Sequence, residues 1–208
     1  MQTLTTIGFV SGRGKSYLAA LVSFSFSLAL IGDKSCFFSV TALRLGKDNP
    51  GGLDKVDPHE RVQAWLDRFG LGLKVIATPS DTATAEAAAA ALGKEVGQIA
   101  KSLLFRVGEE YVMVVAAGDV KIKLGALKRV VGGKPRLATA EEVREITGYP
   151  VGGVCPFALP RPLRVLLDQS LARFPVVYAA AGTPHSAVPV TLEQLAKITG
   201  GEIVEISA

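Results

Sequence analysis

Hydrophobic residues recur at helical spacing in several segments of the chain. The first helix is predicted to begin at Pro58 behind the capping residue Asp57, with Glu60 completing a capping-box pattern, and to end at Gly70. Hydrophobic residues at the same helical spacing predict four more helices. They run from Thr84 to just before Gly93, over 124–131, over 139–146, and in a last segment capped by Thr191.

Runs of β-branched and aromatic residues predict the strands. Two of them, 100–107 and 111–117, are separated by Gly108-Glu109-Glu110 and are typical of a hairpin. Four more strands are expected over 73–77, 163–167, 175–181 and 202–206. Because strands and helices interleave and no repeat is present, the pattern predicts one α/β domain. We expect a mixed sheet that is partly closed into a barrel, with helices around it.

The first 53 residues differ in character from the rest. An uncharged run over 17–31 follows Arg13 and Lys15, and a linker rich in Gly, Asn and Pro follows it at 46–53. Three interpretations stay open for 1–53: a disordered or misassigned extension, an export or membrane-associating segment, or an ordered addition to the fold. We expect the working domain to span 54–208.

Composition excludes several classes of protein. With 208 residues, 49% hydrophobic and 20% charged, the chain has the make-up of a globular domain. Cys36 and Cys155 have no nearby cysteine partner, which excludes a disulfide-dense scaffold and a cysteine-rich zinc site. Neither a His-x-x-x-His spacing nor a Gly-x-Ser-x-Gly motif occurs. The sequence therefore predicts no metal and no cofactor.

The basic charge is unevenly distributed. The net charge is +4, and residues 54–208 carry 18 basic and 17 acidic side chains. However, the stretch between Asp119 and Glu141 has no acid and holds six cations: Lys121, Lys123, Lys128, Arg129, Lys134 and Arg136. Such a run is either a solvated helical face or a surface for a phosphate backbone. Lys121, Lys123, Lys128 and Arg129 are our candidate residues for contacts with such a backbone.

Two features suggest a site. Lys101 lies in the apolar segment 99–105, where burial is costly unless an anionic group meets the ammonium; a lysine that reaches the sheet rim is the alternative. Gly152-Gly153 can expose peptide N–H groups that would hold an anionic oxygen. Cys155 follows, but a cysteine nucleophile needs a base and a lowered pKa. We therefore interpret Cys155 as a small residue that lines a pocket.

Five motifs in unbroken order resemble the YbaK/ProX family of free-standing aminoacyl-tRNA deacylases, which are related to the editing domain of bacterial prolyl-tRNA synthetases. The resemblance covers about 56–206 and none of the leading segment. The motifs are Thr82-Ala-Thr84-Ala-Glu86-Ala-Ala, Gln98-Ile-Ala-Lys101-Ser102-Leu-Leu-Phe, Ala116-Ala-Gly118-Asp119, Gly148-Tyr-Pro-Val-Gly152-Gly153-Val-Cys-Pro156-Phe and Ala179-Ala-Ala-Gly182.

The resemblance implies trans-editing, which is hydrolysis of the ester that joins a wrong amino acid to the 3′ end of a tRNA. Its implied catalytic residues are Lys101, Gly153 and Val154, with water or a hydroxyl of the substrate as the attacking group. The implied substrate-binding residues are Thr82, Thr84, Ser102, Gly152, Cys155, Pro156, Asp168 and Gly182. The chain departs from the family at Cys155, where Ser or Pro is common, and in the apolar segment 157–159, which bears on amino-acid specificity.

The resemblance also implies the partners. Mischarged tRNA is the expected substrate, an aminoacyl-tRNA synthetase is a further candidate partner, DNA is not expected, and the expected location is the cytoplasm. Two rival functions remain open: a non-catalytic tRNA-binding module with the same fold, and a membrane-tethered or exported protein that uses the fold for another purpose.

Overall fold

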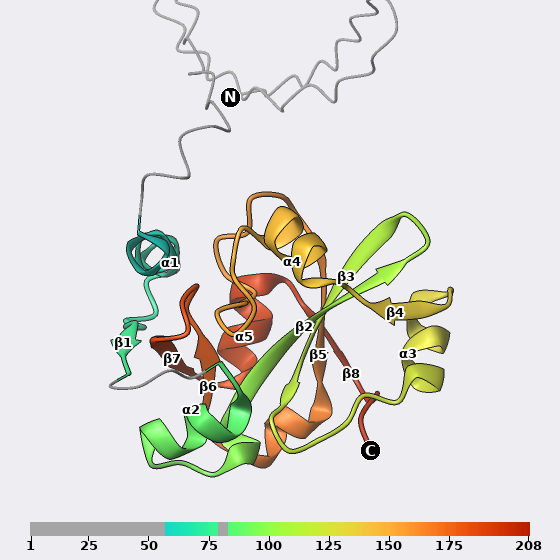
Figure 1. The fold of residues 1–208 in the computed structure, drawn as a ribbon. Coiled ribbons are helices and arrows are strands. Elements are labelled where there is room, and N and C mark those ends of the chain that lie inside the picture. The colour runs from blue at the N-terminus through green and yellow to red at the C-terminus, as the bar shows by residue number, and fades with distance from the viewer. Residues whose placement is uncertain (1–56, 79–82) are drawn as a thin grey trace, which may run out of the picture. The chain divides into compact units, whose positions relative to one another are not determined.

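The computed structural model describes residues 57–78 and 83–208, which form five α-helices around one eight-stranded sheet (Figure 1). The helices are α1 (Pro58–Asp67), α2 (Ala85–Leu92), α3 (Leu124–Val131), α4 (Ala140–Thr147) and α5 (Leu192–Thr199). Two short 3₁₀ helices are η2 (Val96–Gln98) and η3 (Gln169–Arg173). The predicted extension over 1–53 and the candidate residue Thr82 lie outside the described residues.

The sheet is mixed and open. Its strands are β1 (Ile76–Ala77), β2 (Ile99–Val107), β3 (Glu110–Ala117), β4 (Pro135–Leu137), β5 (Arg164–Asp168), β6 (Val177–Ala180), β7 (Ser186–Val190) and β8 (Glu202–Val204). Their order is β1-β7-β6-β2-β3-β5-β8, and β4 pairs with β2. The β2–β6, β3–β5 and β5–β8 pairs are parallel, and the others are antiparallel. The mixed α/β fold is confirmed, whereas the expected partial closure into a barrel is wrong, because β1 and β8 are the two ends of the strand order.

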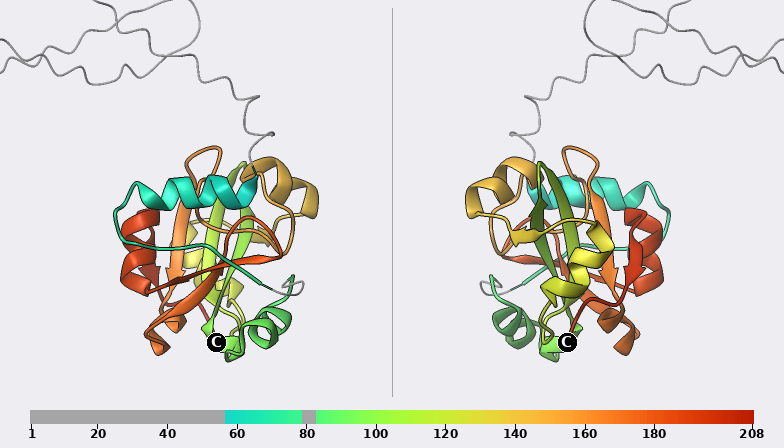
Figure 2. Two further views of the ribbon diagram at one scale, coloured as in Figure 1. Left: turned by 90° about the vertical axis from the view of Figure 1, so that its left-hand side faces the viewer. Right: turned by 90° about the vertical axis from the view of Figure 1, so that its right-hand side faces the viewer.

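Alternate side chains of the central strand β3 build two cores. Met113 and Val115 belong to the larger core, to which α1 and α5 contribute Val62, Leu66 and Leu195. Val112 and Val114 pack instead with Leu127 of α3. Because successive residues of a strand point to opposite faces, α1 and α5 cover one face and α3 covers the other. Figure 2 shows this: α1 lies in front in one view and α3 in front in the opposite view.

The predicted helix starts depend on hydroxyl and carboxylate caps, which the structure contains. The side chains of Asp57, Thr84, Thr139 and Thr191 each accept a hydrogen bond from a backbone N–H in the first turn of their helix. These bonds satisfy N–H groups that have no partner within the helix. Helix α1 ends at Asp67, three residues before Gly70. Within the described ranges, no helix is long and apolar enough to cross a membrane.

Strands β4 and β7 were not predicted, and β1 is shorter than expected. Strand β4 has only three residues, which is too short for an alternating pattern. Strand β7 contains Pro189, which opposes Tyr178 of β6, while β1 pairs only with Ser186 and Ala187. Pro189 therefore sits where β7 has no second strand partner among the described residues, a place where a missing N–H is tolerated.

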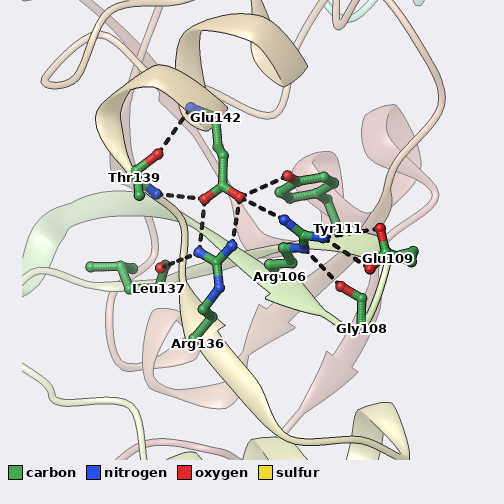
Figure 3. A network of polar contacts seen from close by, with 8 residues as sticks. All are labelled: Arg106, Gly108, Glu109, Tyr111, Arg136, Leu137, Thr139 and Glu142. Atoms are coloured by element: carbon green, nitrogen blue, oxygen red, sulfur yellow. Dashed lines mark hydrogen bonds and ion pairs between the residues drawn. The ribbon is translucent and has the colours of Figure 1, made fainter.

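A polar network joins β2, β3, β4 and α4 through the carboxylate of Glu142 (Figure 3). Arg136 donates to both carboxylate oxygens at 2.6 and 2.8 Å. Arg106 donates at 3.2 Å and the Tyr111 hydroxyl at 2.9 Å, and the Thr139 N–H completes the set at 2.8 Å. The hydrogen bonds from Arg136 and the Thr139 backbone hold the pKa of Glu142 far below its ordinary value of 4.5. The network therefore fixes α4 against the sheet only while this carboxylate is ionised.

Replacing Glu142 with Gln should lower the melting temperature at neutral pH and flatten its dependence on acid pH. Since the folded-state pKa of Glu142 is depressed, its stabilisation is full above about pH 4.5 and is lost as the pH falls below that value. Thermal melts of wild type and Glu142→Gln at pH 7 and pH 3 measure this. Glu145→Gln, on the exposed side of the same helix, is the control. Equal acid sensitivity of wild type and Glu142→Gln would contradict the assignment.

Candidate functional site

One edge of strand β2 is paired with other strands at its two ends but not in its middle. On that edge β6 pairs with Ile99 and Ala100, and β4 pairs with Phe105 to Val107. Among the described residues, no strand pairs with that edge over residues 101–104. A cavity of about 390 Å³ lies here. Its walls come from α2, β2, β6, β7, the end of β4, α4 and the loop 148–163: Ala83, Thr84, Ala85, Ala88, Leu92, Ile99, Ala100, Lys101, Ser102, Leu103, Leu104, Leu137, Ala138, Val143, Val151, Gly152, Val154, Tyr178, Ala180, Ser186 and Ala187.

Lys101 is the charged residue among the described residues of this lining. Lys101 and Phe105 are an even number of residues apart, so their side chains point to the same face of the sheet, where Phe105 packs with residues of α3. Leu104 points to the opposite face and packs against α4. The Lys101 side chain therefore leaves β2 on the α3 face. Its Nζ donates to the carbonyl of Gly118 at 3.0 Å and to that of Val120. Burial lowers the pKa of Lys101, and the charges of Asp119 and Glu86 oppose that shift. An ammonium has three donors, so one remains for a ligand.

The predicted glycine loop reaches the same cavity from the α4 side. Gly152 has φ +90°, and a Cβ there would lie 2.8 Å from the Cα of Ala83 at the start of α2. Only glycine allows both this backbone conformation and this close approach. The N–H of Gly153 donates to the carbonyl of Pro150 at 3.0 Å, so it closes the loop's own turn. Val154 lines the cavity, whereas Gly153 does not.

Residues outside the cavity hold this loop in place. The hydroxyl of the buried Tyr149 donates to the carbonyl of Phe157 at 2.7 Å, and the guanidinium of Arg61 lies 4.6 Å from the Tyr149 ring centre. Gly182 has φ +90°, and a Cβ there would lie 2.8 Å from the Tyr149 ring. Gly182 was expected in the pocket, but the structure places it behind the loop, where its missing side chain lets Tyr149 pack.

Cys155 and Pro156 also lie behind the cavity. Cys155 is 0% exposed and belongs to the larger core, so the structure does not place it in the pocket lining. Burial raises the pKa of its thiol to about 12. Neither His59 nor His185 is among the described residues of the cavity wall. Cys155 is therefore a core thiol whose burial disfavours the thiolate that a nucleophile needs.

Asp168 is not among the described residues that line the cavity, and its carboxylate accepts hydrogen bonds from backbone N–H groups. It is fully buried, and one carboxylate oxygen accepts from the N–H of Ser170 at 3.0 Å. The other oxygen accepts from the N–H groups of Ile206 and Ser207 at 2.9 and 3.1 Å. The structure thus does not bring Asp168 together with Lys101 and Gly152. Its contacts explain its position at the end of β5 without a ligand.

The polar cavity residues Thr84 and Ser102 differ in their bonding. The Thr84 hydroxyl caps α2 by accepting from the N–H of Ala87 at 3.1 Å. The Ser102 hydroxyl is buried, and it has no hydrogen-bond partner among the described residues. Both residues line the cavity, and their expected role in substrate binding stays a prediction.

The wall formed by β4 and α4 was missed by sequence reasoning. Leu137, Ala138 and Val143 line the cavity from that side, and no polar motif marks them. Leu137 is 58% exposed and Val151 is 62% exposed, although both are large apolar residues. Exposed apolar residues beside a cavity are typical of a binding site.

The basic residues lie around α3, on the face of the sheet from which Lys101 projects. Lys121, Lys123, Lys128 and Arg129 are all exposed. Arg136 was counted among the uncompensated cations, but it is paired with Glu142. Outside residues 1–56 and 79–82, no group of three or more His, Cys, Asp or Glu side chains is placed to hold a metal ion. In the described part of the chain, the site therefore combines one ammonium, one glycine loop, one unpartnered hydroxyl and apolar walls.

Known proteins resemble this chain in sequence. Residues 79–198 match the aminoacyl-tRNA editing domain family. YwhH of Bacillus subtilis (strain 168), described as an uncharacterised protein, is 40% identical over 125 residues, which cover 60% of this chain and 80% of YwhH. The multifunctional Ser/Thr-tRNA deacylase ProXp-y of Escherichia coli (strain K12) is 29% identical over 152 residues, which cover 70% of this chain and 90% of ProXp-y.

The fold is also shared with solved structures. A crystal structure proposed to be that of a trans-editing enzyme for prolyl-tRNA synthetase superposes with a TM-score of 0.69 at 41% identity, covering 74% of this chain and 98% of that one. The family match spans more than half of the chain and includes the cavity residues of β2, α4 and the glycine loop. This chain belongs to the family of aminoacyl-tRNA editing domains.

Proposed function

We propose that this protein is a trans-editing deacylase that hydrolyses the ester between a wrong amino acid and the 3′ end of a tRNA. The observation that carries the proposal is that Lys101 and Gly152 line one cavity although they are 51 positions apart and approach it from different elements. The cavity is mostly apolar, which suits a small amino-acid side chain. The family membership and the named activity of ProXp-y support the same reaction.

The reaction develops negative charge on the ester carbonyl oxygen, and the cavity offers donors for it. Since the Gly153 N–H donates to the carbonyl of Pro150, the amide of Val154, which lines the cavity, is the loop's candidate for this oxyanion. Lys101 has one ammonium proton free of the Gly118 and Val120 carbonyls, and this proton can bind a ribose or phosphate oxygen of the terminal nucleotide.

The attacking group is water or a hydroxyl of the substrate. When water attacks, its oxygen bonds to the carbonyl carbon, the bond from that carbon to the ribose oxygen breaks, and the ribose oxygen leaves with a proton. The free amino acid and the intact tRNA result. This route needs no protein nucleophile, which agrees with the burial of Cys155.

The tRNA would approach over the basic residues of α3. Lys121, Lys123, Lys128 and Arg129 are exposed, and α3 itself contains no acidic residue. The exposed Leu137 and Val151 beside the cavity are suited to contact the terminal nucleoside, because the ester inside the cavity is attached to that ribose.

The proposal is tested with purified protein and tRNAs charged with Ala, Cys, Ser or Thr. Wild type should release at least one amino acid, and Lys101→Met should lower kcat/KM by about a hundredfold or more, as removal of an electrostatic donor does in other hydrolytic sites. The variant relieves a partly buried charge but also removes the donor to the Gly118 and Val120 carbonyls, so its rate is corrected for the folded fraction found by thermal melting. Lys197→Met, on the exposed side of α5, is the matched control. No turnover of any tRNA by wild type, together with retained tRNA binding, would favour the non-catalytic binding module.

Replacing Cys155 with Ser should retain most of the deacylation rate. The thiol is fully buried outside the cavity lining, and burial raises its pKa to about 12, so we expect it not to act as the nucleophile. Single-turnover rates of wild type and Cys155→Ser, corrected for the folded fraction, measure this. Complete loss of activity in a folded variant would establish a thiol mechanism instead.

Reversing the charges of Lys128 and Arg129 to Glu should raise KM for tRNA and leave kcat nearly unchanged. Each lost phosphate contact should also reduce the slope of log affinity against log salt by about one. Titrations between low and moderate salt measure both effects. Arg68→Glu with Lys197→Glu is the control, since it makes the same change in net charge at the end of α1 and on α5, and these helices cover the other face. Equal losses in both double variants would remove α3 as the tRNA surface.

A further inference from the structure

Ser102 occupies the middle of the unpaired edge of β2. The carbonyl of Leu104 accepts from the N–H of Ala138 at 2.9 Å, so the peptide groups of Leu104 face the β4 side of the strand. Peptide groups two residues apart in a strand face the same edge. The N–H and C=O of Ser102 therefore face the gap between β6 and β4, where no strand of the described chain pairs with them.

The side chain of Ser102 adds a third free polar group at the same point. Its hydroxyl oxygen is buried and has no hydrogen-bond partner among residues 57–78 and 83–208. The hydroxyls of two other cavity residues are bonded: Thr84 caps α2, and Ser186 pairs with Thr183 at 2.8 Å. A buried hydroxyl without a partner is costly, and it is rare in folded proteins unless a ligand or water completes it.

We propose that Ser102 binds the α-amine of the aminoacyl group through its hydroxyl and the free peptide edge of β2. The inference rests on the proposed function, and it assigns the part of the substrate that is common to every amino acid except proline, whose amine is secondary. The apolar walls would then be left to contact the side chain.

The chemistry of the cavity favours an amine at this place. A neutral amine donates two hydrogen bonds and accepts one, and Ser102 offers two acceptor oxygens and a donor N–H. No Asp or Glu is among the described residues that line the cavity, and Lys101 is already positive there. An ammonium would lack a counter-ion and would be repelled, so the amine is held in its neutral form. Lys101 leaves β2 on the opposite face from Ser102, which keeps the two nitrogen groups apart.

The test compares two substrates on three proteins. The proteins are the full-length wild type, Ser102→Ala and Ser102→Thr. One substrate is tRNA charged with alanine, or with whichever amino acid the panel shows to be released fastest. The other is the same tRNA carrying the matching acyl group without the amine, which for alanine is propionate. The ester and the tRNA are unchanged, so the pair isolates the α-amine.

Ser102→Ala should lower kcat/KM for the aminoacyl-tRNA by about tenfold to a hundredfold and change it little for the acyl-tRNA. Ser102→Thr, which restores the hydroxyl, should recover much of the loss. An equal loss on both substrates, or none on either, would overturn the amine contact. No release by wild type from any tRNA would contradict the proposed deacylase function itself, so the two failures are distinguishable.

Thermal stability separates a binding hydroxyl from a structural one. Ser102→Ala removes a hydroxyl that has no partner in the described chain, so its melting temperature should equal or exceed that of wild type. Ser170→Ala is the matched comparison, because the Ser170 hydroxyl accepts from the N–H of Ala117 at 3.2 Å and its loss should lower the melting temperature. A fall in Ser102→Ala as large as that in Ser170→Ala would show a structural role and overturn the proposal.

Discussion

The cavity depends on a break in strand pairing along one edge of β2. Strands β6 and β4 cover the two ends of this edge, and residues 101–104 between them keep their place through β3 on the other side. Peptide groups inside a protein need partners, so a gap of this length in the middle of a sheet is costly unless something fills it. The sheet therefore provides rigid donors and acceptors at the centre of the cavity, and the surrounding helices and loop provide its walls.

Lys101 and the glycine loop reach this edge of β2 from different sides, and different kinds of contact hold them in place. Lys101 is fixed on the α3 face by the carbonyls of Gly118 and Val120. The glycine loop is fixed on the α4 side by close packing, with Gly152 against Ala83 and Gly182 against the ring of Tyr149. Substitutions therefore act differently at the two places. The hydrogen bonds of Lys101 tolerate a change in side-chain shape, whereas a Cβ added at Gly152 or Gly182 would clash with its neighbours.

Many helices and strands could be predicted from local sequence patterns, but which residues line the cavity could not. Hydroxyl caps at Thr84, Thr139 and Thr191 fixed the starts of three helices, because a cap is a contact within four residues. Strand β7 could not be predicted, because its position depends on β6 and β1 rather than on its own proline-containing sequence. Within the site, motif resemblance selected Lys101, Ser102 and Gly152, which line the cavity, and their roles stay predictions. It also selected Cys155, Asp168 and Gly182, whose buried positions behind the cavity are evident only in three dimensions.

The carboxylate of Asp168 makes the last residues of the chain part of the interior. One of its oxygens is held by the amides of Ile206 and Ser207, and Ile206 is fully buried beside Leu166 and Leu127. If a carboxypeptidase removed the three residues after Glu205, this oxygen would lose both of its donors. The protein would then hold a buried negative charge without these hydrogen bonds, which is destabilising. A tag joined after Ala208 would leave both of these backbone donors in place.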